Sequence, residues 1–318
     1  MPIYLKTTLM NQDFKQRLRK WRSGLSIALF LALLTGLVYW TWQHQLIIQQ
    51  ILRELGPLKV VELVFLFMVA ILLSALNFTV LVRSMDYQFT YINGYHSLNL
   101  SQVAAMVPGK IWGFAGLAGL LWTQGISKRD SVLIIFLYTI FMLSAAVLVG
   151  TVGLIPAIGW GYTFLCLLPV LILLLGRSWL DPLRLRFFAG SSPLPSALNM
   201  VFILLIGMIS WVVMSVSFAL LVYGAEGRWP VSPWLIASAF PAGYVVGFIS
   251  LIAPSGLGVR EGIIVIILGP SLSHEKALAL AIVFRVLHTI VLWLNIMISL
   301  SALTVKAYLS NMNIKLKE

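Results

Sequence analysis

This chain of 318 residues has little of the chemistry that metalloenzymes and disulfide-stapled proteins use. It contains one cysteine, Cys166, and ten acidic residues against 22 lysines and arginines. A single cysteine excludes an internal disulfide and a site with two thiolate ligands. The few carboxylates are not clustered and no His-Glu-x-x-His sequence occurs. We therefore predict no metal site and expect no cofactor.

Motifs of nucleotide and acyl chemistry are also missing. The chain has no Gly-rich loop ending in Lys-Ser/Thr that would hold a nucleotide. It has no Gly-x-Ser-x-Gly sequence that would present a serine nucleophile. We therefore assign no catalytic residue and expect a protein that is not an enzyme. Charged residues make up only 10% of the chain, against about 25% in a typical soluble domain.

Long apolar segments account for most of what is present, since hydrophobic residues make up 60% of the chain. Crossing the hydrocarbon core takes about 20 apolar residues. Two apolar regions, 92–124 and 233–270, are interrupted in the middle and read as re-entrant helical hairpins. The sequence thus predicts an all-α polytopic membrane protein whose residues 1–318 form one transmembrane domain. The six expected spans are Gly24–Trp42, Val60–Val82, Ser131–Gly150, Gly161–Leu175, Ala197–Tyr223 and Ala277–Val305.

The positive charges predict the orientation of the chain. If each interrupted region enters and leaves on one face, the outer side holds only Arg53, Lys59, Arg228 and Lys276. This asymmetry follows the positive-inside rule. It places the basic segment 1–23 and the tail 306–318 in the cytoplasm, with the protein in the plasma (inner) membrane. The cytoplasmic side would hold Lys6, Lys15, Arg17, Arg19, Lys20, Arg22, Arg83, Lys128, Arg129, Arg177, Arg184, Arg186, Lys306, Lys315 and Lys317.

The net charge of +12 therefore needs no nucleic-acid partner. Basic residues at span ends face the anionic headgroups of the inner leaflet. We expect membrane lipid as the partner of this chain.

The second interrupted region contains Pro254, Gly256, Gly258 and the adjacent pair Arg260 and Glu261. Unpaired backbone groups cost several kcal/mol each in hydrocarbon, so such a break survives only inside protein or beside water. Ionisable groups at this depth indicate a functional site by default. We therefore predict a substrate site here, with glycines that let the backbone approach a ligand closely.

A helix that resumes near Val259 would place Arg260 and Glu261 in its first turn. The helix dipole favours a carboxylate there, and the free N–H groups of the turn could hold a phosphate. For Glu261 the alternatives are a substrate site and a simple helix cap. For Arg260 they are a substrate site and a side chain that reaches outward to the interface.

The last span carries a polar stripe of Arg285, His288, Asn295 and Ser299. At 100° per residue these four lie within an arc of about 80°, which should face the bundle interior. Arg285 is the expected partner of Glu261 or of a ligand phosphate, although the pair could also be purely structural. His288 could relay protons or form a hydrogen bond with a neighbouring helix.

The two interrupted regions match at an offset of 146 residues, so that Pro108 falls on Pro254 and Gly116 on Gly262. Three spans lie between them, which would place the hairpins on opposite faces as an inverted repeat. Paired helix breaks of this kind indicate a transporter's central site, although kinked packing helices would also contain Pro and Gly. Lys110 follows Pro108-Gly109 and could attract an anionic headgroup or reach to the inner interface.

The run Pro254-x-Gly256-x-Gly258-x-x-Glu261, with Arg285 in the next span, resembles the lysylphosphatidylglycerol synthase transmembrane-region family. Pro108-Gly109-Lys110 is similar to an earlier break in some members, and the likeness covers roughly Leu76 to Val305. The family is flippase-like, so the resemblance implies a lipid translocase. Two-domain members are thought to flip aminoacylated phosphatidylglycerol, and stand-alone members are linked to export of lipid-linked glycans. This chain has no transferase domain, so we expect a stand-alone member.

Our expectation is a flippase-like lipid translocase that moves a phosphate-bearing phospholipid or lipid-linked glycan between leaflets. Glu261, Arg285, Arg260, Lys110, Gly256, Gly258 and His288 would bind the substrate, and Pro108, Gly109 and Pro254 would break the helices. One alternative is a membrane-embedded transferase on a polyprenyl or phospholipid donor, which would need an acid–base or metal centre. The other is a scaffold for envelope glycosyltransferases, which would then be its partners.

Overall fold

Every regular element is a helix in the part of the chain that the computed structural model describes, residues 35–36, 38–105, 111–175, 177–188, 190–250 and 256–315. This confirms the predicted all-α class. The helices are α2 (Gln45–Arg83), α3 (Tyr91–Ala105), α4 (Ile111–Thr123), α5 (Lys128–Leu175), α6 (Arg177–Phe187), α7 (Ala197–Glu226), α8 (Pro233–Ile249), α9 (Val259–Leu272) and α10 (His274–Lys315).

Long apolar helices confirm the prediction of a polytopic membrane protein. Within the described residues, four stretches are long and apolar enough to cross a bilayer: Gln45–Arg83, Lys128–Ile155, Ala197–Glu226 and His274–Ala302. They coincide with four of the six predicted spans. The predicted span over residues 24–42 lies largely outside the described residues. The predicted span over residues 161–175 lies in the part of α5 that follows the break at Gly159.

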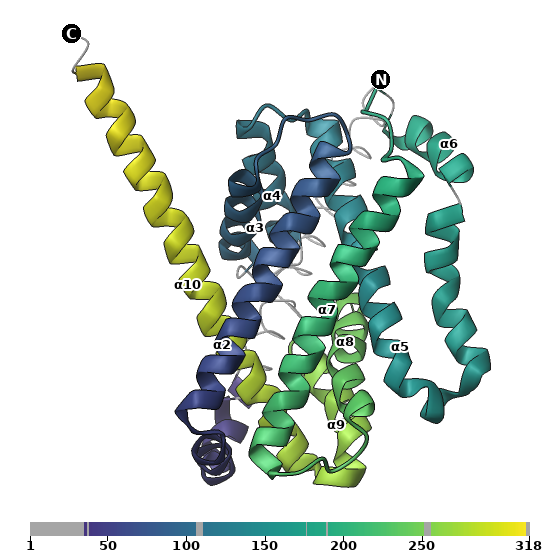
Figure 1. Ribbon diagram of the computed structural model, residues 1–318, viewed down its shortest axis with the longest axis vertical. Coiled ribbons are helices and arrows are strands. Elements are labelled where there is room, and N and C mark those ends of the chain that lie inside the picture. The colour runs from purple at the N-terminus through teal and green to yellow at the C-terminus, as the bar shows by residue number, and fades with distance from the viewer. Residues whose placement is uncertain are drawn as a thin grey trace, which may run out of the picture.

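Glycines with positive φ break two of these helices. Gly56 (φ 62°), followed by Pro57, bends α2 near its beginning. Gly159 (φ 74°) divides α5 into two arms, and Figure 1 shows that these arms run in opposite directions, with α6 following the second. Glycine adopts positive φ without the strain that a Cβ would add. The turn lies between the two spans predicted over Ser131–Gly150 and Gly161–Leu175, where the sequence contains Pro156 and Gly159.

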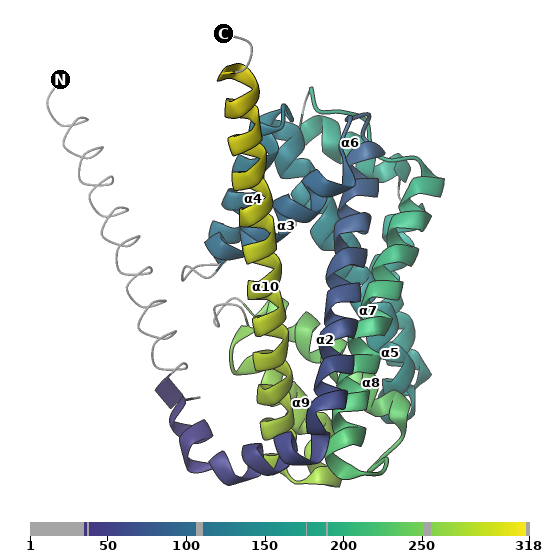
Figure 2. The same cartoon turned by 60° about the vertical axis from the view of Figure 1, so that its left-hand side comes forward.

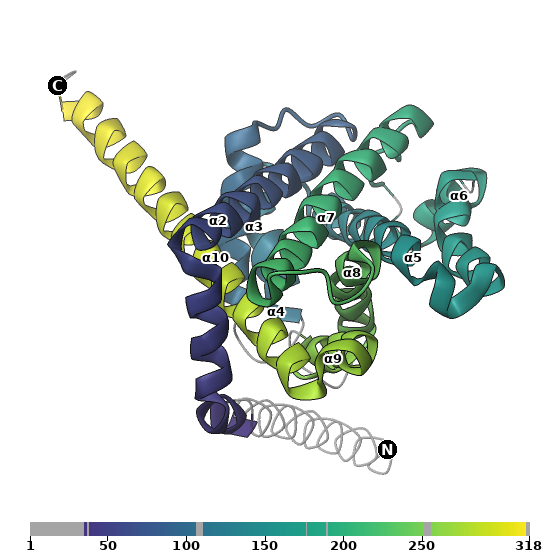
Figure 3. The same ribbon diagram turned by 60° about the horizontal axis from the view of Figure 1, so that its bottom comes forward.

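The interrupted regions each form an antiparallel pair of short helices. In α3 and α4, the Gln124 side-chain amide donates to Ser97 Oγ at 2.9 Å, and Gly113 lies against Ala105 at the other end of the pair. Figures 1 and 2 place α3 and α4 at one end of the molecule and α8 and α9 at the other. Viewed from that second end, α8 and α9 lie beside α7 and the beginning of α10 (Figure 3).

Aromatic side chains fill the core where α2, α7, α8 and α10 meet. The Phe284 ring makes edge contacts with Phe67, Phe218 and Phe240 at centroid distances of 4.9, 5.1 and 4.7 Å. Edge-to-face pairs of this kind add to the packing energy of the buried rings. The cluster packs α10 against α2, α7 and α8.

Asp130 joins three segments at the end of the molecule where α5 begins. Its side chain is 4% exposed. It accepts hydrogen bonds from Tyr87 Oη at 2.6 Å, Ser127 Oγ at 2.8 Å and the Ser192 backbone N–H at 2.7 Å. The carboxylate thus ties the turn after α2 and the segment before α7 to the first turn of α5.

Replacing Asp130 by Asn should destabilise the fold. An amide presents one acceptor oxygen in place of two, so a buried donor is left without its partner at a cost of about 1–3 kcal/mol. Asp86→Asn is the matched control, because Asp86 is exposed at the same end of α2. Thermal unfolding in lipid nanodiscs would measure both variants, and an equal midpoint for the two would contradict the role given to Asp130.

Candidate functional site

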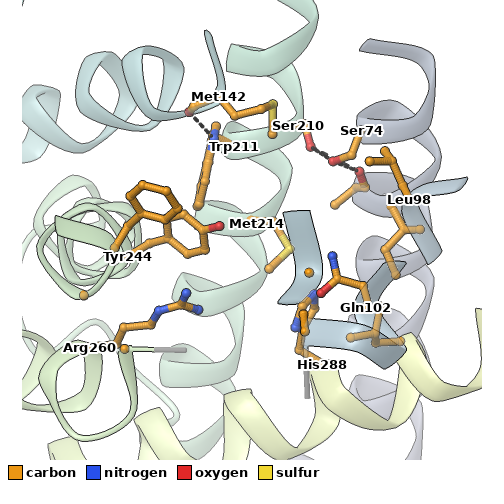
Figure 4. Close-up of a pocket in the computed structure, with 18 of the residues that line it drawn as sticks. Ser74, Leu98, Gln102, Met142, Ser210, Trp211, Met214, Tyr244, Arg260 and His288 are labelled. Atoms are coloured by element: carbon orange, nitrogen blue, oxygen red, sulfur yellow. Dashed lines mark hydrogen bonds between the residues drawn. The ribbon is translucent and has the colours of Figure 1, made fainter. Parts of the chain in front are cut away.

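A cavity of about 570 Å³ lies between the two pairs of short helices. Pockets of roughly 300–1,000 Å³ hold drug-sized ligands, so this one has room for a lipid headgroup. Residues from α2, α3, α4, α5, α7, α8, α9 and α10 line it, and Figure 4 shows part of this lining. The cavity is therefore reached by both interrupted regions of the sequence.

Glu261 lies where α9 begins. The helix starts at Val259 as predicted, and Gly258 is its N-cap with φ 79°. Glu261 Oε2 accepts the Gly258 backbone N–H at 2.8 Å, which satisfies one of the donors that a helix start leaves unpaired. The residue is only 3% exposed, so its carboxylate is held inside the protein.

Arg285 on α10 supplies the counter-charge. Its Nη1 forms an ion pair and a hydrogen bond with Glu261 Oε1. The structure thus brings together the two residues that the sequence analysis paired across 24 positions. The same carboxylate caps α9 and pairs with Arg285 on the cavity wall.

Arg260 lies on the cavity wall. Its guanidinium Cζ lies 4.1 Å from the centroid of the Tyr244 ring, a cation–π contact. Figure 4 shows the side chain passing below Tyr244 toward the space that faces His288 and Gln102. Its Nε is buried and makes no hydrogen bond in the described part of the chain.

Two glycines on α8 make room for this arginine. A Cβ on Gly247 would lie 2.5 Å from Arg260 Cγ, and one on Gly243 would lie 2.9 Å from the Arg260 carbonyl oxygen. Gly256, with φ 66°, also lies against Arg260 Nε. The sequence analysis missed Tyr244 and the Gly243-x-x-x-Gly247 spacing. That spacing is a known signal of close helix packing in membranes.

The polar stripe of α10 faces the bundle interior, as predicted. Asn295 and Ser299 are fully buried, and Arg285 and His288 line the cavity. Tyr95 on α3 donates its hydroxyl to Asn295 Oδ1 at 2.5 Å. His288 packs its ring edge-on against Phe67, with centroids 5.4 Å apart.

The first helix pair supplies neutral polar groups to the same cavity. Asn99, Ser101 and Gln102 on α3 line it, together with Thr139 on α5. The sequence analysis assigned none of these to the site, because single hydroxyls and amides are frequent where membrane helices pack. The predicted residues Pro108, Gly109, Lys110 and Pro254 lie outside the described residues.

Residues that line the cavity recur at the spacing of the sequence repeat. Many lining positions in the first half have a lining counterpart 146 residues later. The chemistry of the counterparts differs, since the second member of several pairs is charged or aromatic where the first is not. Such pairs are Leu98 and Tyr244, Phe114 and Arg260, Thr139 and Arg285, and Met142 and His288.

No group of three or more His, Cys, Asp or Glu side chains that could hold a metal ion occurs among the described residues. The chemistry that the described lining offers is electrostatic and hydrogen-bonding.

These features define a class: an all-α, multi-pass membrane protein with an ion pair and a further arginine on the wall of an internal cavity. The chain belongs to the family described as "Lysylphosphatidylglycerol synthase TM region", whose model matches residues 13–294. The membership expected from the Pro254–Glu261 run is thereby confirmed, and lipid is the class of molecule that the family handles. A search of curated proteins found no significant match.

The Glu261–Arg285 pair can be tested by a double-mutant cycle. Removing one partner of a buried pair leaves an uncompensated charge and costs about 3–5 kcal/mol. Glu261→Gln and Arg285→Gln should each lower the unfolding midpoint in nanodiscs, and the double variant should recover part of the loss. Arg53→Gln and Glu54→Gln, both exposed on α2, are the matched controls. Additive effects of the two cavity substitutions would contradict the coupling.

Proposed function

We propose that this protein is a lipid translocase that moves a phosphate-bearing lipid headgroup between the two leaflets through the cavity between α3–α4 and α8–α9. The observation that carries the proposal is the position of Arg260, a cation on the cavity wall beside an ion pair that is already complete. A charged group is costly to place in hydrocarbon. A polar path that holds the headgroup while the tails stay in lipid removes much of that cost.

The arrangement of the helix pairs supports this function. α3–α4 and α8–α9 lie at opposite ends of the molecule (Figure 2), and the lining residues recur with an offset of 146. We interpret the pairs as re-entrant hairpins of an inverted repeat. Broken helices in matching positions of two inverted halves characterise the central sites of many transporters. Alternating exposure of such a site to the two sides would carry the headgroup across.

The positive-inside rule indicates the orientation. Arg83, Lys128 and Arg129 lie near the end where α2 stops and α5 starts, and we propose that this end faces the cytoplasm. The α8–α9 pair would then open toward the outer side of the plasma (inner) membrane.

Leaflet exchange in liposomes tests the proposal. Purified protein is reconstituted with trace fluorescent lipids, and a membrane-impermeant reductant reports the label that reaches the outer leaflet. Arg260→Gln should slow exchange by at least about tenfold, a loss of about 1.4 kcal/mol of stabilisation of the crossing state. It leaves the Glu261–Arg285 pair intact, and an unfolding midpoint in nanodiscs equal to that of the wild type would show that slow exchange does not reflect unfolding. Glu261→Gln should also lose exchange.

Arg53→Gln and Glu54→Gln serve as controls and should exchange lipid at the wild-type rate. Wild-type protein that exchanges none of the lipids offered would refute the proposal. So would exchange that survives Arg260→Gln and Glu261→Gln unchanged, because a scaffold would tolerate both substitutions.

A further inference from the structure

We infer that the headgroup carried by this cavity has one phosphodiester charge and several hydroxyl groups, with neither an amine nor a second phosphate. This inference rests on the proposed translocase function and specifies its substrate class. It follows from the charges and the hydrogen-bonding groups that the described residues place around the cavity.

The charges of the described lining leave one cation uncompensated. The residues in it with a formal charge are Arg260, Glu261 and Arg285. Glu261 and Arg285 pair with each other. The ion pairs among the described residues are Arg184–Asp181, Lys276–Glu226 and Arg285–Glu261, so Arg260 takes part in none of them. One negative charge on the ligand would balance the cavity.

A cationic headgroup finds no unpaired acid in the described lining, because Glu261 is paired with Arg285. Both carboxylate oxygens of Glu261 are already used, Oε1 by Arg285 and Oε2 by the Gly258 N–H. Among the described lining residues, an ammonium group would therefore find no unpaired carboxylate, and a second phosphate would find no second unpaired cation. The penalty for an unpaired buried ion is several kcal/mol. This penalty is large enough to exclude a headgroup that carries an ammonium group or a second phosphate.

Three hydroxyl groups of the described lining act as acceptors toward a ligand. Ser101 Oγ donates to Leu98 O at 2.8 Å, Thr139 Oγ1 to Ile135 O at 2.8 Å and Thr289 Oγ1 to Arg285 O at 2.7 Å. Each hydroxyl has one hydrogen and two lone pairs, so the hydrogens are spent within the helices and the oxygens can still accept. Such a wall suits a ligand rich in O–H donors, such as glycerol or a sugar.

The unpaired cation and two of these three hydroxyls lie on different helices, which would orient the ligand. Arg260 belongs to α9, whereas Ser101 and Thr139 belong to α3 and α5. Phe114, which lines the cavity 146 residues before Arg260, gives the first half no charge at the equivalent position. The phosphate would therefore lie toward α8–α9 and the hydroxyl-bearing part toward α3 and α5.

A panel of headgroups in the liposome assay tests this inference. Phosphatidylglycerol and a hexosyl-phosphoryl-polyprenol both carry one phosphodiester and hydroxyls, and comparing them separates glycerolipid from polyprenyl sources. Phosphatidylethanolamine and lysylphosphatidylglycerol add amines, and a polyprenyl-diphosphate sugar adds a second phosphate. At least one of the first two should exchange about tenfold faster than each of the other three, which corresponds to about 1.4 kcal/mol.

Adding a second cation should change this selectivity. Phe114→Arg should raise exchange of the diphosphate lipid by about tenfold relative to Phe114→Gln, its uncharged control. Preferred exchange of an amine-bearing or diphosphate lipid by the wild type would overturn the inference and leave the translocase function standing. Exchange of no lipid in the panel would overturn both.

Discussion

The start of α9 inside an apolar bundle is the constraint on which the site depends. A helix start leaves backbone N–H groups without partners, and hydrocarbon cannot satisfy them. Glu261 meets one of these donors through Gly258, but its own charge then needs compensation. Arg285, one helix away on α10, supplies it. A local backbone requirement thus fixes a carboxylate in the core, and the carboxylate in turn fixes an arginine on the facing helix.

Close helix packing decides where the remaining arginine lies. Because Gly243 and Gly247 have no side chains, α8 can approach α9 until the Arg260 carbonyl oxygen lies against Gly243 and the Arg260 side chain lies against Gly247. Tyr244, between the two glycines, then offers its ring face to the guanidinium. A cation on an aromatic face keeps its hydrogen-bond donors available for a ligand, whereas a cation paired with a carboxylate does not. The glycines and the tyrosine therefore hold Arg260 on the cavity wall, outside the Glu261–Arg285 ion pair.

The sequence was sufficient for the parts of this structure that follow from strong local rules. Apolar length predicted the long helices, and the 3.6-residue period of α10 predicted that Asn295 and Ser299 would be buried. Because a charged group buried in a membrane protein needs a partner, Glu261 led to the prediction of Arg285 as its counter-charge. The features that the sequence analysis missed depend on how close helices lie to one another in the folded chain. The inward direction of Arg260 depends on the distance between α8 and α9, and the contribution of Ser101 depends on which face of α3 meets the cavity.

The chemistry of the cavity is asymmetric although its walls follow a repeated layout. Positions 146 residues apart line it together, yet the pairs Phe114 and Arg260 or Thr139 and Arg285 differ in charge. Each buried ion carries a desolvation penalty that a partner must offset. Charges in both halves would double that penalty and would hold an anionic ligand at two places. In the described lining the charges lie in one half only, so the first-half residues described there can bind through neutral oxygens and orient a ligand.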